Sequence, residues 1–404
     1  MTYPHEAWRR LEDEPPPMPF PKRGMPERLV LSEIKARLAK DRDPRKNFAV
    51  WAFWSHPIAK KALNLALDTH SVGELNLVYP EVYKMTHETV RMIGSLLGAK
   101  DPSGFITTGG TESNMSAVRL ARNLKKKDRP EIVMPYTAHY SFHLAAELFG
   151  VRPRIARVDR EYRPNMGDIR RLINKNTVAL ACSAYEPTLG AIDPVEEFGE
   201  LAEKHDLYLH VDSCVGGFFL PFMRELGYSV PKFDFSIPGV SSMSADPHKQ
   251  GLSVIPSSSF IMRDRGYLDA IPVEEVYLPT LSSSKSGASA VATWAVLKHL
   301  GMDAYKKYVK NSIDITRSLA ESIRTIDGLD LLTEPRFNVL TFTSKKHDPF
   351  KINERMMRRG WTLFSGTLDP YPDKFVHFIV HPCKTKDIAD ELLDDLKKSV
   401  SESR

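Results

Sequence analysis

Cysteine is scarce in this sequence. Its 404 residues include only Cys182, Cys214 and Cys383, which lie far apart and form no CxxC pair. This spacing argues against a zinc site, and we expect no bound metal. An odd number of scattered cysteines with mostly apolar or small neighbours predicts reduced thiols and a cytoplasmic protein.

Long apolar runs are also missing. No stretch of about 18 apolar residues occurs, so we expect no membrane span. The apolar and aromatic segment 48–54 is far too short. The first 20 residues are polar and proline-rich, without the apolar core of a signal peptide. Five prolines between Pro15 and Pro21 predict an extended arm.

The sequence has little excess of charge of either sign. Its net charge is +5, and basic residues are interleaved with acidic ones. We therefore expect no nucleic-acid partner. The short run of lysines at 125–127 follows a helical pattern, and cations suit the C-terminal end of a helix.

What is present is a regular alternation of helical and strand-like patterns. The length suits two or three packed units. From residue 56 onward, helices alternate with short apolar strands, which indicates an α/β fold with a mostly parallel central sheet covered by helices. The expected helices span 27–40, 56–70, 86–97, 112–124, 140–148 and 195–204, and the expected strands 104–110, 131–134, 177–182 and 207–211.

The last hundred residues have a different pattern. They predict a smaller α+β unit with helices at 304–326 and 385–400 and strands at 338–343 and 375–381. We therefore expect three parts: an N-terminal arm and helix (1–55), a large domain (56–303) and a small C-terminal domain (304–404).

A polar stretch at 241–251 contains His248 and Lys249, followed by a glycine. Such a lysine could carry an aldehyde cofactor as a Schiff base, which requires a low pKa and a confined site. The alternative is an ordinary surface loop.

Asp212 ends the apolar strand that precedes it. Ligands bind at the carboxyl ends of strands in α/β sheets. A buried carboxylate there needs a partner, and a protonated pyridine nitrogen is one. A capping or structural aspartate is the alternative.

Two further stretches follow predicted strands. In TTGGTESN at 107–114, Gly110 and Thr111 open a helix, where free backbone N–H groups can bind phosphate. In TAHYSF at 137–142, His139 could stack on an aromatic ring. A plain capped helix and a structural histidine are the alternatives. The four stretches together are more specific than any one of them, and they indicate a pyridoxal-phosphate site.

On these motifs, the chain resembles the group II pyridoxal-phosphate decarboxylases and the related sphingosine-1-phosphate lyases, from about residue 55 to 396. The matching stretches are 107–114, 137–142, HVDSCVGGF at 210–218 and SADPHKQG at 244–251. The resemblance implies fold type I, a large domain (56–303) that binds pyridoxal phosphate, a small C-terminal domain, and a homodimer with a shared active site.

The resemblance also implies roles for single residues. Lys249 would form the Schiff base and Asp212 would pair with the pyridine nitrogen. His139 would stack on the ring. The cofactor phosphate would be held by Gly110, Thr111 and His248.

Residues toward the substrate depart from the pattern of both families. In the family, a small-residue and arginine segment of the neighbouring subunit lies near the phosphate, and here the segment 282–287 has Lys285 for the arginine. His377 stands where the decarboxylases carry an arginine for the substrate carboxylate. Tyr79 stands where the lyases carry a histidine for the substrate phosphate.

The resemblance divides between two reactions. Stretches at 55–67, 236–240 and 246–249 look like the archaeal tyrosine and aspartate decarboxylases, whereas those at 90–98, 109–113, 211–214 and 376–378 look like the lyases. We predict a carbon–carbon lyase that decarboxylates an L-amino acid such as aspartate or tyrosine. The alternatives are cleavage of a phosphorylated amino alcohol, another pyridoxal-phosphate reaction, and a non-catalytic dimer. The proton could be moved by Lys249, His139, Tyr140 or Tyr79.

Overall fold

The computed structural model describes residues 19–69, 77–270, 280–282 and 285–402. Part of the predicted proline-rich arm (15–18) lies outside the described residues, as do Ser283 and Ser284 of the segment that contains Lys285.

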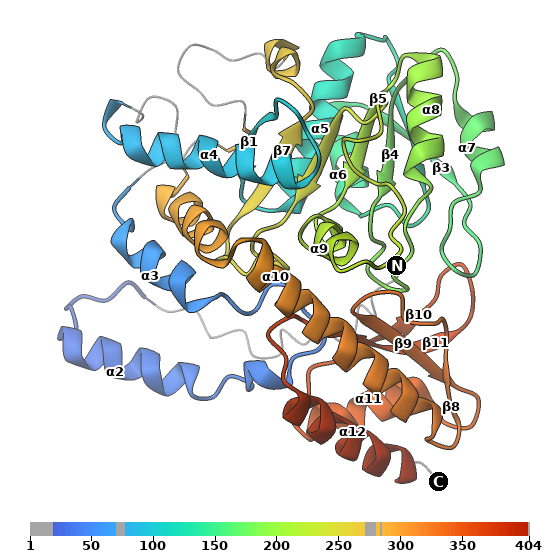
Figure 1. The fold of residues 1–404 in the computed structure, drawn as a ribbon. Coiled ribbons are helices and arrows are strands. Elements are labelled where there is room, and N and C mark those ends of the chain that lie inside the picture. The colour runs from blue at the N-terminus through green and yellow to red at the C-terminus, as the bar shows by residue number, and fades with distance from the viewer. Residues whose placement is uncertain (1–18, 70–76, 271–279, 283–284, 403–404) are drawn as a thin grey trace.

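A seven-stranded sheet forms the centre of the larger part of the molecule (Figure 1). Its strand order is β1-β7-β6-β5-β4-β2-β3, and every neighbouring pair from β6 to β3 is parallel, whereas β7 runs antiparallel to both β1 and β6. The predicted α/β fold is therefore confirmed. The strands are β1 (Ser103–Thr107), β2 (Glu131–Pro135), β3 (Arg152–Ala156), β4 (Thr177–Ser183), β5 (Tyr208–Asp212), β6 (Ser242–Ala245) and β7 (Ser258–Met262).

Helices cover both faces of this sheet because both faces of its strands are apolar. On β2, Ile132 and Met134 pack in one buried cluster with α5 (Gly110–Lys125) and α6 (Ser141–Phe149). Val133, between them, points to the other face, where α4 (Pro80–Leu96) and α8 (Val195–His205) pack. Burial on both faces is typical of parallel sheets. The remaining helical elements of this part are α3 (Pro57–Leu65), α7 (Met166–Leu172), α9 (Leu220–Glu225), η3 (Gly216–Phe218) and η4 (Arg265–Ala270).

A long helix, α10 (Gly287–Arg324), runs from the large sheet to the smaller part of the molecule (Figure 1). The Ser286 side chain caps its start by accepting a hydrogen bond from the Ala288 N–H. The helix breaks at Gly301, whose φ of 57° and ψ of −173° are not helical. The predicted domain boundary after residue 303 falls two residues beyond this break and stays a prediction.

The smaller part contains a four-stranded antiparallel sheet of order β10-β11-β9-β8, with one helix packed on it and a second helix packed on the first. Its elements are β8 (Leu329–Leu331), β9 (Val339–Ser344), β10 (Phe364–Thr367), β11 (Lys374–Ile379), α11 (Pro349–Arg358) and α12 (Lys386–Ser401). The predicted C-terminal α+β unit is therefore present, with two more strands and one more helix than the sequence patterns suggested.

The N-terminal segment packs into this smaller unit. After η1 (Pro44–Lys46), the Phe48 N–H donates to the Thr362 carbonyl over 2.8 Å, and the Phe48 carbonyl accepts from the Ile379 N–H over 2.7 Å. The Phe48 ring is fully buried between Trp361 and Phe378. The core of the smaller unit is therefore built from both ends of the chain.

Helix α2 (Glu27–Leu38) lies apart from both sheets, at the lower left of Figure 1, and none of its residues is buried. Among the described residues, none of the helices is both long and apolar enough to cross a membrane.

Candidate active site

Lys249 is paired with a buried carboxylate. It lies in the turn after β6, and its Nζ atom is 2.8 Å from Oδ2 of Asp246, whose side chain is fully buried. Burial alone would lower the pKa of Lys249, but the attraction of Asp246 outweighs it and the pKa is raised. Burial would likewise raise the pKa of Asp246, but Lys249 and His248 hold it well below its usual range.

His248 lies on the other side of Asp246. Its Nδ1 accepts a hydrogen bond from the Ser257 N–H over 3.1 Å, so the ring proton is on Nε2. That Nε2 lies 3.5 Å from Oδ2 of Asp246. Asp246 therefore links His248 and Lys249, the two residues that the sequence predicted for this site.

Asp212 is held at the carboxyl end of β5 by donors from three segments. Its Oδ1 accepts from the Cys214 N–H over 3.1 Å and from Ser244 Oγ over 3.2 Å, and its Oδ2 accepts from Asn114 Nδ2 over 2.8 Å. Burial would raise the pKa of Asp212, but nearby His139 and the Cys214 N–H outweigh it, so the pKa is lowered. Asp212 is therefore a buried, ionised and oriented carboxylate.

Asn114 orients this carboxylate through a network of its own. Its Nδ2 also donates to Ser141 Oγ over 3.0 Å, so its Oδ1 must accept from Nε2 of His210, 3.0 Å away. The other ring nitrogen of His210 then accepts from Ser242 Oγ over 2.8 Å. Burial lowers the pKa of His210 to about 4, so this ring is neutral and serves as a fixed donor.

His139 lies between β2 and α6 and joins the same network. Its Nδ1 lies 2.8 Å from Ser141 Oγ and accepts from the Ser141 N–H over 3.3 Å. Burial lowers the pKa of His139, although the charge of Asp212 acts in the opposite direction. The ring of Tyr140 lies 4.4 Å from that of His139, centroid to centroid.

Gly110 closes the site from the start of α5. A Cβ atom added there would lie 2.3 Å from Cys214 Sγ and 2.9 Å from Asp246 Oδ2, so only glycine allows the helix start to approach so closely. Thr111 follows it in the first turn of the helix, where backbone N–H groups have no partner within the helix.

The contacts therefore join the predicted residues into one site at the carboxyl ends of β1, β5 and β6. The path of contacts runs from His139 through Ser141 and Asn114 to Asp212, and from there through Ser244, Cys214, Gly110 and Asp246 to His248 and Lys249. A lysine amine, an ionised carboxylate and the N-terminal end of a helix thus lie within one connected set.

For the three predicted substrate residues, the described contacts are with residues outside this connected set. Lys285 Nζ lies 2.8 Å from Oε1 of Glu112 in the first turn of α5. Tyr79 donates through its hydroxyl to the Asp68 carbonyl over 3.0 Å.

His377 is buried in β11 of the smaller sheet. Its Nδ1 lies 2.9 Å from Thr341 Oγ1, whose hydroxyl donates to the Thr188 carbonyl over 2.6 Å. Burial lowers the pKa of His377 to about 4, so it is a neutral group. The roles proposed for it and for Tyr79 stay predictions.

Several residues of the site had no assigned role in the sequence prediction. Both Asn114 and Asp246 lie inside the motif stretches; the partners of Asn114 are distant in sequence, whereas those of Asp246 include its near neighbours His248 and Lys249. His381, from the smaller unit, lies with its Nε2 3.3 Å from the Lys249 carbonyl, and the Cys383 N–H donates to its Nδ1. The only sequence signal for His381 was its position at the end of the predicted strand 375–381.

Comparison with known proteins decides what kind of protein carries this site. The pyridoxal-dependent decarboxylase conserved domain matches residues 62–345. The chain belongs to this family. The match covers every residue of the connected set, whereas His381 lies beyond it, and the predicted family is therefore confirmed.

Relatives of known sequence carry decarboxylase names. The chain is 39% identical to a probable L-tyrosine/L-aspartate decarboxylase of Methanothermobacter thermautotrophicus, over 78% of this chain and 88% of that protein. It is 34% identical to an L-aspartate decarboxylase of Thermococcus kodakarensis, over 94% of this chain and 98% of that protein.

A solved structure points to the second predicted family. The sphingosine-1-phosphate lyase of Burkholderia pseudomallei superposes with a TM-score of 0.87 and 29% identity, over 100% of this chain and 95% of that one. Decarboxylases with lower identity share the fold, among them the glutamate decarboxylase of Lactobacillus brevis, with a TM-score of 0.86 and 19% identity.

The residues present fit pyridoxal phosphate, the cofactor of the family. Gly110 allows the start of α5 to lie against Asp246 and Cys214, and Lys249 and Asp212 provide an amine and an ionised carboxylate within the same set of contacts. Among the described residues, no group of three or more His, Cys, Asp or Glu side chains could hold a metal ion.

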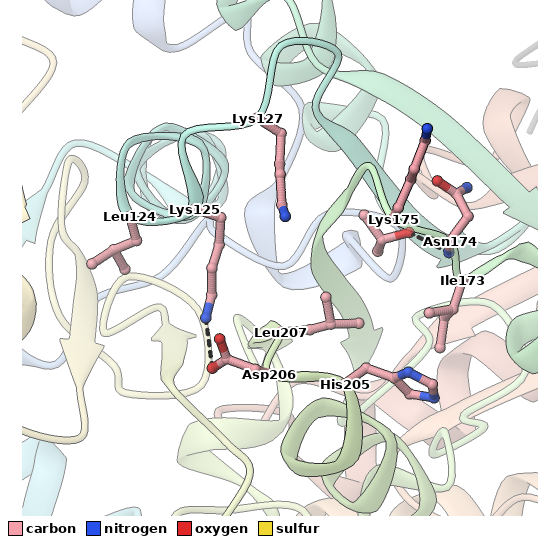
Figure 2. A pocket seen from close by; sticks show the side chains of 10 residues that line it. Leu124, Lys125, Lys127, Ile173, Asn174, Lys175, His205, Asp206 and Leu207 are labelled. Carbon is pink, nitrogen blue, oxygen red and sulfur yellow. Dashed lines mark hydrogen bonds and ion pairs between the residues drawn. The ribbon is translucent and has the colours of Figure 1, made fainter.

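A separate hollow of about 680 Å³ lies at the opposite, amino end of the parallel strands. Figure 2 shows its side chains, among them Lys125, Lys127 and Lys175, with Lys125 paired to Asp206 over 2.8 Å. Helices α5, α7 and α8 end beside it, and cations are favourable near helix C-termini. These lysines therefore offset helix dipoles, and the hollow is no part of the Lys249 site.

Proposed function

We propose that this protein decarboxylates an L-amino acid, aspartate, tyrosine or a similar one, to its amine at the Lys249 site. The observation that carries the proposal is the identity of 34–39% to relatives named for these reactions, which extends over most of both chains. The connected set around Lys249 and Asp212 supports it independently.

Each residue of the set has a proposed task. Lys249 would hold the cofactor covalently. Asp212 would pair with the pyridine nitrogen and favour its protonated form, since an ionised carboxylate favours a cationic partner. His139 would stack on the ring, and Gly110, Thr111 and His248 would hold the phosphate. The bound cofactor supplies a cationic conjugated ring that takes up the electron pair of the broken bond.

The protein must also return a proton to the carbon that loses the carboxylate. Lys249, once displaced, carries an amine within the site, and Asp246 favours its protonated form because the two lie 2.8 Å apart. Lys249 is therefore our first candidate for the proton donor, ahead of His139, Tyr140 and Tyr79.

A second function is cleavage of a phosphorylated amino alcohol. The 29% identity to a sphingosine-1-phosphate lyase over the whole chain favours it. The absence of an arginine at His377 agrees with it, because a buried neutral histidine is a poor partner for a substrate carboxylate. If this function holds, Tyr79 and Lys285 are the next residues to test as anchors of the substrate phosphate.

One experiment separates the two functions. The purified holoenzyme is incubated with aspartate, glutamate, tyrosine, phenylalanine, tryptophan and sphingosine phosphate, and products are identified by mass spectrometry. Carbon dioxide with the matching amine is the expected result. A fatty aldehyde with phosphoethanolamine would replace the first function by the second. Lys249→Ala is the control, and it should abolish either product.

We also propose a homodimer in the cytoplasm, with residues of both subunits at each active site. Helix α2 supports the dimer, because Leu31, Ile34 and Leu38 are 48%, 46% and 62% exposed on a helix with no buried residue. A helix of 12 residues is marginal in water without a packed apolar face. Three free cysteines support a reducing compartment. Light scattering of the purified protein tests the dimer.

A further inference from the structure

A buried ion pair lies beside the proposed phosphate site. The side chains of Lys285 and Glu112 are 7% and 8% exposed, and the Lys285 ammonium lies 2.8 Å from Oε1 of Glu112. The ammonium also donates to the Ile106 carbonyl at the end of β1, over 3.2 Å. Two opposite charges buried in this way are costly unless both are paired, so the position of each depends on the other.

Glu112 connects three segments around the start of α5. Its Oε2 accepts from the N–H and the hydroxyl of Thr108, over 2.7 and 2.8 Å, and its Oε1 accepts from the Leu281 N–H over 3.2 Å as well as from Lys285. It is the third residue of the helix, after Gly110 and Thr111. Its backbone is therefore within one helical turn of the N–H groups proposed to bind phosphate.

The charges of this region explain why the pair matters. Two buried carboxylates lie near Gly110 and Thr111. Asp246 lies beside Gly110 in space, and Glu112 directly follows Thr111 in the sequence. A bound phosphate would add further negative charge to this region. Lys249 neutralises Asp246, and Lys285 is the cation in contact with Glu112. Burial would raise the pKa of Glu112, but Lys285 lowers it, so the carboxylate is ionised.

We propose that Lys285 is a positioning residue that neutralises Glu112, so that the start of α5 can bind the cofactor phosphate without repulsion from that carboxylate. Its role is thus indirect, through Glu112, rather than as an anchor of the substrate. The inference rests on the proposed function in one respect, the assignment of Gly110 and Thr111 to the cofactor phosphate.

The test compares two ligands that differ only in the phosphate. Apoenzyme is titrated with pyridoxal phosphate and with pyridoxal, and binding is followed by absorbance. For Lys285→Met, we expect the affinity for pyridoxal phosphate to fall at least tenfold and that for pyridoxal to fall less than threefold. The double variant Lys285→Met/Glu112→Gln should recover most of the loss. Lys310→Met, which breaks an exposed ion pair with Asp314, is the matched control.

Equal losses for the two ligands, or a double variant no better than Lys285→Met, would overturn the inference and leave the pair a structural tie. If Lys285→Met does not fold, Glu112→Gln alone decides. Removing the carboxylate should then raise the preference for pyridoxal phosphate over pyridoxal, and an unchanged or lower preference would contradict the inference. Failure of the proposed function would look different, because the wild-type protein itself would then not distinguish the two ligands.

Discussion

The Nζ atom of Lys249 and the carboxylate of Asp246 lie 2.8 Å apart, three residues from each other in the chain. Asp246 is fully buried, so this is a strong pairing, and it favours the charged ammonium of Lys249. The free amine, however, is the form that attacks an aldehyde. The pair that positions the lysine therefore also restrains its reactivity before the cofactor is bound.

Asp246→Asn should release that restraint. The pKa of Lys249 is raised by Asp246 and to a lesser extent by Asp212, while burial opposes both. Without the Asp246 charge the pKa falls, the amine is populated at lower pH, and cofactor attachment to apoenzyme should be about tenfold faster at neutral pH. Stopped-flow absorbance across a pH series measures this. A pH profile identical to that of the wild type would show that Asp246 does not control the lysine.

Asp212→Ala should reduce turnover by tenfold or more, which corresponds to about 1.4 kcal/mol in the barrier. The reason is that the cofactor ring would lose its buried counter-charge. The kcat with the best substrate of the panel is the measurement. Asp206→Ala, at an exposed ion pair with Lys125, is the control and should leave kcat unchanged. A smaller loss for Asp212→Ala would mean that this carboxylate acts elsewhere.

Asn114→Ala should lower both stability and activity. The change leaves buried Asp212, Ser141 and His210 each without one hydrogen-bond partner. An unsatisfied buried polar group costs about 1–3 kcal/mol, so we expect a loss of this order in the free energy of unfolding. Denaturant titration measures it, and kcat of the folded fraction reports the orientation of Asp212. Full stability with full activity would contradict the network.

Asp193→Asn should stabilise the protein above neutral pH. Burial raises the pKa of Asp193 to about 7, from 3.8 in the unfolded chain. The folded state therefore holds the proton more tightly, and stability falls as pH rises from about 4 to 7. The shift corresponds to at most about 4 kcal/mol.

Asparagine removes this titration and can still accept from the Ser183 N–H, which binds Oδ2 of Asp193 over 2.7 Å. Thermal unfolding at pH 5 and pH 8 is the measurement. The variant should gain stability over the wild type at pH 8 and little at pH 5. An equal difference at both values would show that Asp193 does not titrate in this range.

His381→Ala should slow the attachment of the cofactor to Lys249 and also lower the stability of the protein. The histidine packs 5.0 Å from the Phe53 ring and donates from Nε2 to the Lys249 carbonyl. Its removal leaves a cavity and frees the turn that carries Lys249, so we expect slower cofactor attachment and lower stability by about 2–4 kcal/mol. Reconstitution rate and thermal unfolding together test this. His381→Gln should restore part of the rate because its amide can donate to the same carbonyl.

The sequence patterns predicted the parts of the fold that have strong local signals. Apolar strands such as β4 and helices such as α8 lie within one or two residues of their predicted positions. Strand β6 (SMSA) and strand β7 (SSFIM) were missed, because their serines are buried through hydrogen bonds that only neighbouring segments supply. Alternation of polar and apolar residues cannot indicate such strands.

For the site too, residues whose contacts are distant in sequence could not be predicted from local patterns. Lys249, Asp212 and His139 could be predicted because the chemistry of a cofactor requires those residue types at strand ends. Asn114 and His381 could not, since their roles depend on partners 98 and 132 residues away. No property of a single stretch of sequence contains that information.

The burial of Phe48 in the smaller unit has a consequence for synthesis of the protein. Its partners Thr362 and Ile379 emerge from the ribosome more than 300 residues later, at synthesis rates of about 5–20 residues per second. During that interval the segment around Phe48 lacks the residues that bury it, whereas all strands of the large sheet have already been synthesised before Thr362 and Ile379. The smaller unit can therefore close only after nearly the whole chain has been made, whereas the segments of the large sheet are complete earlier.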